Sequence, residues 1–307
     1  MSQSLKIATR KSKLALWQAE HVAALLREAH PGLQVELVPM TTQGDRIQDR
    51  SLAAIGGKGL FIKELEVAIE ERRADIAVHS MKDVPADLPP AFAIGAVLPR
   101  ADTRDALISN RHSSIDTLPQ NARVGTSSLR RQAQLLARRS DLAIEPLRGN
   151  VDTRLKRLDD GGLDAIVLAS AGLIRLGWES RITERVSATI CLPAVGQGAI
   201  GIECRVGDDL TLKRLEVLDH AQTRIALTAE RAFSQTLGGS CQSPIAALAQ
   251  IENGRLKLAG LVAEPDGSRV LRDFIDGASD QAANLGAALA RRMLDAGARA
   301  LLERLRA

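Results

Sequence analysis

Short apolar runs alternate with longer amphipathic runs in "ARVGTSSLRRQAQLLARRSDLAIEPLRGNVDTRLKRLDDGGLDAIVLAS", residues 122–170. The apolar runs have the length of strands, and the amphipathic runs have helical spacing. The pattern predicts a strand at 122–126, a helix at 127–139, a strand at 142–147, a helix at 150–161 and a strand at 164–170. Strands that alternate with helices form parallel sheets with helices on both faces. This stretch therefore predicts an α/β domain.

The same order of elements occurs nearer the N-terminus. A strand at 5–10 precedes a run from Ala15 to Ala29 whose apolar residues recur at helical spacing, and a second strand follows at 33–38. A helix at 61–73 and a buried strand at 75–80 complete the repeat. We therefore expect two similar α/β domains.

A Gly-rich, charged segment distinguishes the first copy from the second. It spans residues 41–59 and reads "TTQGDRIQDRSLAAIGGKG". The segment is too polar for a core, so it predicts a lid. A surface loop without a function is equally compatible with this composition.

The last third of the chain has a different pattern. A helix is predicted at 225–237, three antiparallel strands within 244–275, and one long helix at 280–305. The turns between the strands fall at Asn253-Gly254 and Asp266-Gly267. We expect a separate α+β domain here.

The composition narrows the class of protein and the kind of ligand. The chain has 307 residues, 45% of them hydrophobic and 25% charged, which suits a globular protein of two or three domains. Aromatic residues make up 2% and tyrosine is absent, so few side chains could stack on single-stranded nucleic acid. The net charge of +4 comes mainly from arginine, which pairs with carboxylates and phosphates. A small polyanionic ligand is therefore expected.

The cysteines and the apolar runs indicate where the protein works. The three cysteines, Cys191, Cys204 and Cys241, are scattered, which favours neither disulfides nor a zinc site. No run of residues has the length and hydropathy of a signal peptide or a membrane span. We therefore expect a reducing cytoplasm, no membrane, no nucleic acid and no metal.

One cysteine lies among small and polar residues. Cys241 is part of "LGGSCQSPIA", residues 237–246, where the neighbouring glycines leave the thiol sterically open. No second Cys or His lies close enough in sequence to share a metal with it. His79 also lacks a partner at metal-ligand spacing, and we interpret it as a core histidine or as one that supports a residue of the site.

Polar and cationic residues follow the predicted strands. In open parallel sheets, ligands bind beyond the carboxyl ends of the strands. Cations in a first helical turn oppose the helix dipole, so Arg130 and Arg131 favour an anionic ligand there. A solvated surface position remains the alternative for each arginine. The strand-end candidates are Arg10, Ser12, Thr126, Ser128, Arg130, Arg131, Arg148, Arg154 and Arg175.

A carboxylate also follows a predicted strand. Asp83 belongs to "HSMKDVP", residues 79–85, in which Pro85 favours an extended Val84. In extended chain the side chains of Lys82 and Asp83 diverge. An ordinary ion pair between Asp83 and Lys82 or an arginine is the alternative to a catalytic role.

Seven motifs occur in order along nearly the whole chain. They are "IATRKSKLALWQAEHV", "TTQGDRIQDRSLAAIGGKGLFIKELE", "DIAVHSMKDVP", "VGTSSLRRQAQL", "LRGNVDTRLKRL", "LPAVGQGAIGIECR" and "LGGSCQSPIA". They resemble the motifs of the porphobilinogen deaminase family, also called hydroxymethylbilane synthases. Lys13 stands where the family is expected to have proline.

The resemblance implies a three-domain fold. Two similar α/β domains resembling periplasmic binding proteins would comprise residues 1–98 with 199–216, and residues 104–192. A smaller C-terminal α+β domain with a three-stranded antiparallel sheet would comprise residues 221–307. In this arrangement "AIGIECR" returns to complete the first domain, which spacing alone does not predict. The resemblance also implies a monomer.

The resemblance implies a transferase of tetrapyrrole and heme biosynthesis. Such an enzyme joins four porphobilinogen molecules head to tail, releases ammonia each time and finally hydrolyses off hydroxymethylbilane. The chain grows on a dipyrromethane cofactor held by a thioether, which the match places on Cys241. Each pyrrole ring carries an acetate and a propionate, which accounts for many arginines.

The match also assigns roles to individual residues. Asp83 corresponds to the catalytic carboxylate. Cofactor-binding positions are Cys241, Ser80, Lys82, Thr126, Ser128, Arg130, Arg131, Arg148, Arg154 and Gln197. Substrate-binding positions are Arg10, Ser12, Gln18, Lys58, Phe61, Arg148, Arg154 and Arg175.

Two other classes of function remain open. A binding module built on the duplicated domains would hold an anion without turnover, but it leaves Cys241 unexplained. An enzyme with Cys241 as a free nucleophile would need a base, and no histidine lies close to it in sequence.

Overall fold

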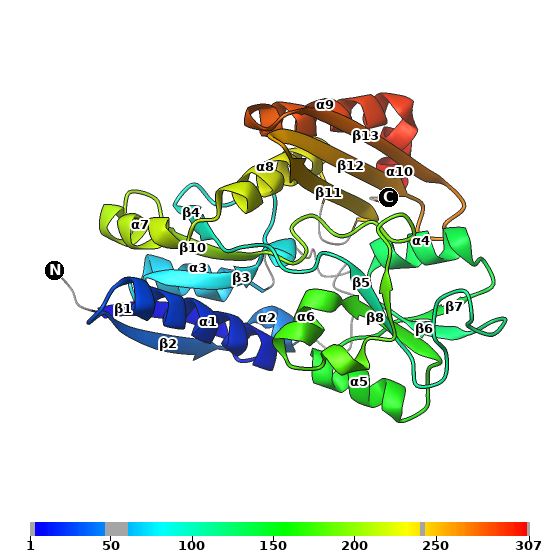
Figure 1. Cartoon of the computed structure of the whole chain (residues 1–307), viewed down its shortest axis with the longest axis horizontal. Coiled ribbons are helices and arrows are strands. Elements are labelled where there is room, and N and C mark those ends of the chain that lie inside the picture. The colour runs from blue at the N-terminus through cyan, green and yellow to red at the C-terminus, as the bar shows by residue number, and fades with distance from the viewer. Residues whose placement is uncertain (1–3, 47–60, 240–242, 306–307) are drawn as a thin grey trace. The chain divides into compact units, whose positions relative to one another are not determined.

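The computed structural model describes residues 4–46, 61–239 and 243–305, drawn as ribbons in Figure 1. The chain divides into two compact units. Unit 1 comprises residues 1–101 and 199–224, and unit 2 comprises residues 102–198 and 225–307. The three-domain boundaries expected from the sequence separate unit 2 further, and they stay a prediction.

Unit 1 is built on a five-stranded sheet in the order β2-β1-β3-β10-β4. Strand β1 pairs in parallel with β2 and β3, whereas β10 is antiparallel to both β3 and β4. The strands are β1 (Ser4–Arg10), β2 (Gln34–Met40), β3 (Ile76–Ser80), β4 (Phe92–Val97) and β10 (Ile200–Arg205). The helices are α1 (Lys13–Ala29), α2 (Gln43–Arg46), α3 (Lys63–Glu70), α7 (Asp209–Leu215), η2 (Met81–Asp83) and η4 (Glu216–Leu218).

Helices cover both faces of this sheet because its strands are apolar on both sides. Leu5 and Ile7 of β1 pack in one core with Val22 of α1. Ala8 and Leu65, which come from β1 and α3, belong to a second core. The α/β fold class predicted for this part is therefore confirmed.

Unit 2 contains a second five-stranded sheet, in the order β7-β6-β8-β5-β9. Strand β6 is parallel to β7 and β8, and β5 is antiparallel to β8 and β9, so the sheet repeats the topology of unit 1. The strands are β5 (Asp105–Ile108), β6 (Arg123–Gly125), β7 (Ala143–Glu145), β8 (Ala165–Ala169) and β9 (Glu184–Val186). The helices are α4 (Leu129–Arg138), α5 (Val151–Asp159), α6 (Ser170–Arg175) and η3 (Glu179–Arg181).

The parallel strands predicted from the sequence are present, but they form only part of each five-stranded sheet. Each five-stranded sheet adds two strands to the three that the sequence predicts, and these pair antiparallel. The return of "AIGIECR" to the first sheet, as β10, is confirmed.

Unit 2 also contains the predicted three-stranded antiparallel sheet. Its strands are β11 (Ile245–Glu252), β12 (Arg255–Ala263) and β13 (Val270–Ala278). Asn253 and Gly254 have φ values of 50° and 74°, as the predicted tight turn between β11 and β12 requires. The helix α9 (Ala282–Met293) packs along β12 and β13 (Figure 1). Phe233 of α8 (Ala221–Thr236) lies in the core that they share.

The prediction of a single long helix at 280–305 is wrong, because this segment is interrupted. A short 3-10 turn, η5 (Ser279–Gln281), precedes α9, and the π-helical η6 (Leu294–Ala298) separates α9 from α10 (Arg299–Arg304). Gly297 within η6 has φ 109°, which interrupts the helix.

The lid expected at 41–59 lies mostly outside the described residues; the part that is described ends in α2. Within the described ranges, no helix has the length and hydropathy needed to cross a membrane.

Candidate functional site

The predicted ligand-binding residues of unit 2 follow the parallel strands of its five-stranded sheet. Thr126 follows β6, Arg148 follows β7, and Arg175 ends the helix that follows β8. Because β6 is parallel to both β7 and β8, the carboxyl ends of these strands share one edge of the sheet. That edge is where open α/β sheets bind ligands.

Serine side chains fix the turn after β6. Ser128 caps α4, and its Oγ accepts a hydrogen bond from Arg131 N at 3.4 Å. Ser127 Oγ donates to Leu147 O at 3.0 Å, and Leu147 N donates back to the same Oγ at 2.9 Å. The turn is therefore anchored to the segment after β7.

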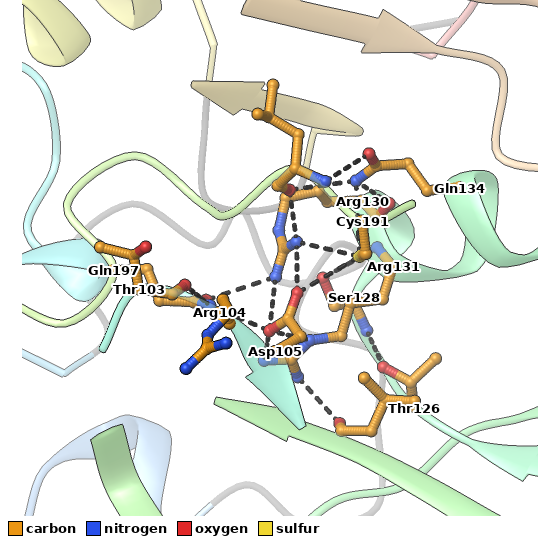
Figure 2. A network of polar contacts seen from close by, with 12 residues as sticks. Thr103, Arg104, Asp105, Thr126, Ser128, Arg130, Arg131, Gln134, Cys191 and Gln197 are labelled. Carbon is orange, nitrogen blue, oxygen red and sulfur yellow. Dashed lines mark hydrogen bonds and ion pairs between the residues drawn. The ribbon is translucent and has the colours of Figure 1, made fainter. Parts of the chain in front are cut away.

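A buried carboxylate organises the first turn of α4 (Figure 2). Asp105, the first residue of β5, is fully buried. Arg130 Nη1 and Arg131 Nη2 each donate to it at 2.7 Å, and Gln197 Nε2 donates to it at 3.0 Å. Burial by itself raises the pKa of Asp105, but the two guanidinium groups outweigh it and hold that pKa well below its usual range. Asp105 is therefore an ionised partner of both arginines.

A thiol and an amide extend this network (Figure 2). Cys191 Sγ donates to Asp105 Oδ2 at 3.3 Å. Burial, helped by the Asp105 charge, raises the pKa of Cys191 to about 12, so this thiol stays neutral at physiological pH. Gln134 Nε2 and Arg130 Nη1 both donate to Leu192 O, at 3.1 and 2.7 Å.

This network changes the argument for Arg130 and Arg131. The sequence favoured a ligand because cations at a helix N-terminus oppose the dipole. Asp105 compensates that cost within the protein, so the dipole no longer argues for a ligand. The cofactor contacts of both arginines and of Gln197 stay predictions.

Asp105 was not among the residues predicted for the site, although one feature of the sequence points to it. Asp105 opens the apolar run "DALI", residues 105–108, which forms a fully buried strand. An ionised carboxylate at such a position requires a cationic partner. The spacing of residues near Asp105 does not indicate that its cationic partners, Arg130 and Arg131, lie on α4.

The remaining arginines at this edge are held differently. Among the described residues, none forms an ion pair or hydrogen bond with Arg148. Arg154 Nε donates to Gly149 O at 2.8 Å, and Arg175 Nη2 donates to Gly198 O at 2.7 Å. Burial lowers the pKa of Arg175 to about 10, which still leaves it charged at neutral pH. This positive edge has the donors that the carboxylates of a dipyrromethane cofactor would require.

Unit 1 brings several of its predicted residues together in pairs. Gln18 of α1 is buried, and its Nε2 donates to Ser80 Oγ at 2.8 Å. Ser12 caps the same helix by accepting from Ala15 N at 3.3 Å. The end of β3 is therefore tied to the first half of α1.

Arg10 and Phe61 are also brought together. The Arg10 guanidinium carbon lies 4.3 Å from the centroid of the Phe61 ring. Arg10 Nε donates to Asp45 Oδ2 at 3.2 Å. Burial opposes the charge of Asp45, but hydrogen bonds from Arg10 and Thr42 overcome it and lower the pKa of Asp45. The partner Asp45 was not predicted.

Asp83 lies in a short turn rather than in extended chain. Met81–Asp83 form the 3-10 helix η2, so the extended conformation predicted for Lys82 and Asp83 is wrong. Val84 is extended, as expected before a proline, with φ −84° and ψ 123°. The Asp83 carboxylate is half-buried, and no described residue forms an ion pair with it.

A second pair of buried polar side chains joins β3 to β10. His79 Nε2 is 2.8 Å from Glu203 Oε2, and both side chains are buried, which confirms His79 as a core histidine. Burial, and then the charge of Glu203, raise the pKa of Glu66 on α3. Local patterns could not reveal the pairing of His79 with Glu203, because Glu203 lies on β10, which is distant in sequence from β3.

The structure assembles these residues within their own units. Two predicted residues, Cys241 and Lys58, lie outside the described ranges. The residues of unit 1 are Arg10, Ser12, Gln18, Phe61, Ser80, Lys82 and Asp83. Those of unit 2 are Thr126, Ser128, Arg130, Arg131, Arg148, Arg154, Arg175 and Gln197.

Comparison with known families gives two matches along the chain. Residues 5–213 match the family model described as porphobilinogen deaminase, dipyromethane cofactor binding domain. Residues 224–295 match the model described as porphobilinogen deaminase, C-terminal domain.

Comparison with solved structures gives distant similarities. The VFT2 domain of Bordetella pertussis BvgS is 14% identical at a TM-score of 0.43, with 70% of this chain and 85% of that chain covered. The methionine-binding protein MetQ is 14% identical at a TM-score of 0.44, with 69% and 88% covered.

Proposed function

The chain belongs to the porphobilinogen deaminase family of transferases, and on that premise we propose that it builds hydroxymethylbilane from four porphobilinogen molecules. It joins them head to tail on a covalently attached dipyrromethane, releases ammonia at each addition and finally hydrolyses off the product. The observation that carries this proposal is the match of both family models, which together span residues 5–213 and 224–295.

The cofactor would be attached to Cys241 through a thioether. The two cysteines that the structure describes are poor candidates, because both are buried. Burial raises the pKa of Cys191 to about 12 and that of Cys204 to about 11, so neither supplies a thiolate. Cys241, in its small-residue segment, is the remaining thiol.

The strand-end arginines of unit 2 would hold the ring carboxylates. A guanidinium matches a carboxylate with two parallel hydrogen bonds. Arg148 has the strongest claim, since no described residue neutralises it. Arg154 and Arg175 donate to backbone carbonyls in the hydrogen bonds described above, which hold both guanidinium groups at this edge. When bound, dipyrromethane supplies the free pyrrole position at which the first ring is added.

Asp83 would move the protons. An ionised carboxylate stabilises the positive charge that develops on porphobilinogen as its amino group departs. The same group can give a proton to the leaving amine and accept one at the new ring junction. The absence of an ion pair among the described residues leaves the Asp83 carboxylate for this task.

Intact mass spectrometry of the native protein tests the attachment and separates the three classes of function. We expect a mass above that of the sequence by two pyrrole units, and the excess should be absent from Cys241→Ser. A binding module or a free-thiol enzyme predicts the bare sequence mass. An active native protein at that bare mass would contradict the proposal.

We further propose a monomer in the cytoplasm whose partner is porphobilinogen, with neither nucleic acid nor membrane bound. Light scattering on the eluted protein tests the oligomeric state, and a dimer mass at micromolar concentration would contradict it.

A further inference from the structure

The two faces of the three-stranded sheet in unit 2 are covered unequally. Leu258 and Ile275 face the core that contains α9. Their neighbours Ala259 and Phe274 pair with each other and point to the opposite face, because side chains alternate along a strand. Leu192 and Ala133 cover the part of that face nearest Leu261. Phe274 is left 74% exposed.

A cavity of about 570 Å³ lies beside this exposed part. A volume of this size suits a small organic ligand. Its walls are mainly apolar, with two cations and one carboxylate among them. The lining residues are Ala188, Thr189, Leu192, Leu248, Gln250, Lys257, Leu258, Ala259, Arg272, Phe274, Ile275 and Asp276.

Only one of the charged lining groups lacks an ionic partner within the described part of the chain. Lys257 Nζ is 2.8 Å from Glu252 Oε2, and Asp276 Oδ2 is 2.5 Å from Arg255 Nη2. Arg272, in contrast, donates from Nη1 to Thr189 O at 2.8 Å and from Nη2 to Gln134 Oε1 at 3.2 Å. Both acceptors are uncharged, so the positive charge of Arg272 is not neutralised.

The two contacts also orient the Arg272 guanidinium. A guanidinium has five N–H donors, and two neutral acceptors use only part of this capacity. Arg272 is exposed, so its remaining donors are open to a ligand from solution. A guanidinium that is held in place can pair with a carboxylate through two parallel hydrogen bonds, which a lysine cannot form.

We propose that this cavity is a binding site for a small aromatic carboxylate, whose carboxylate pairs with Arg272 and whose ring packs against Phe274 and Leu192. The single unpaired cation selects one negative charge, and the apolar walls select a flat hydrocarbon body. The site uses none of the strand-end residues assigned to the cofactor or to porphobilinogen. It therefore stands independently of the proposed function.

Titration calorimetry of the full-length protein with 2-naphthoate tests this site. We expect saturable binding, with an affinity at least tenfold weaker for Arg272→Gln, because a hydrogen-bonded charge pair is lost. Phe274→Ala should also weaken binding several-fold. Its exposed side chain contributes little to the fold, so this variant should fold normally. The neutral analogue 2-naphthamide should bind the native protein weakly.

Arg291→Gln is the matched control, because it also removes one positive charge and Arg291 is an exposed residue of α9. It should bind 2-naphthoate as the native protein does. The proposal is overturned if the native protein shows no saturable binding at millimolar 2-naphthoate. It is also overturned if Arg272→Gln binds as tightly as Arg291→Gln, since the carboxylate would then be recognised elsewhere.

Discussion

At the scale of single residues, Asp105 is the group on which the first turn of α4 depends. Two buried guanidinium groups share its carboxylate, at 2.7 Å from Arg130 and 2.7 Å from Arg131. Removing one member of a buried ion pair leaves the other charge without compensation, which costs roughly 3–5 kcal/mol. The network is therefore expected to stabilise unit 2 whether or not a ligand is bound.

We predict that Asp105→Asn lowers the free energy of unfolding by roughly 3–5 kcal/mol at pH 7, measured by urea denaturation. Asp116→Asn is the control, since its ion pair with Arg138 is exposed and should contribute little. The pKa of Asp105 is lowered in the folded state, so its contribution is present above the unfolded value of about 3.9 and is lost as the pH falls through the folded value. The difference between native protein and variant should therefore shrink below about pH 4. Equal stability of the two variants at pH 7 would argue against the network.

No described residue neutralises Arg148, so substituting it tests whether this cation binds a carboxylate of the ligand. Lysine keeps the charge but cannot form the two-pronged contact with a carboxylate. We predict that Arg148→Lys slows turnover roughly tenfold, in line with the loss of one charge-assisted hydrogen bond. The control is Arg157→Lys, because Arg157 is exposed, donates to Pro146 O at 3.2 Å and pairs with Glu145 at 4.0 Å. Indistinguishable turnover of the two variants would remove Arg148 from the site.

Substitutions of Asp83 test whether its carboxylate transfers protons in the reaction. Asp83→Asn keeps the shape but removes the negative charge, so turnover should fall by at least ~10²–10⁴-fold. Asp83→Glu keeps the charge but displaces it, and a shift on the order of 1 Å can cost ~10²-fold, so it should be slow yet measurable. Because the site is expected to assemble its own cofactor, both variants are first supplied with preformed hydroxymethylbilane. An Asn variant as fast as the native protein would mean that another group moves the protons.

At the scale of elements, the sequence predicts best where periodicity is long. The helices α1 and α4 and the strands β11 to β13 were all predicted, because each carries a sustained period or a marked turn. The strands β5 and β9 were not predicted, since neither is followed by a helix and so neither takes part in the alternation of strands and helices that marks β6 and β7. Their antiparallel pairing depends on tertiary contacts that local sequence does not encode.

The interruption between α9 and α10 shows another limit of local patterns. The apolar spacing continues through Gly297, so the sequence predicts one helix. In the structure Gly297 has φ 109°, and a Cβ there would lie 2.8 Å from Arg269 Nη2. A positive φ strains residues other than glycine.

We predict that Gly297→Ala destabilises the protein by roughly 1–2 kcal/mol, seen as a lower Tm. Gly162→Ala is the matched control, because a Cβ there meets nothing within 4 Å. It should leave the Tm unchanged or slightly higher. A Tm for Gly297→Ala equal to that of the control would mean that Gly297 is not required for the interruption.

At the scale of the whole molecule, the site was predicted in part. Strand ends and motif matches selected residues at the carboxyl ends of the parallel strands of unit 2 and in the turn after β3. They did not reveal that Arg130 and Arg131 share a buried carboxylate, or that Arg10 pairs with Asp45. These partners come from segments distant in sequence, so their positions depend on the folded sheets. Sequence patterns can therefore locate polar residues, but not the charges that already neutralise them.

We propose above that the chain extends a pyrrole polymer on its own cysteine. Rapid mixing with a few equivalents of porphobilinogen, followed by acid quenching and intact mass spectrometry, tests this most directly. We predict a ladder of enzyme-bound species, each heavier than the last by one pyrrole unit and ending at four additions. Cys241→Ser should show no ladder. A native protein that consumes porphobilinogen while its own mass stays constant would contradict the account.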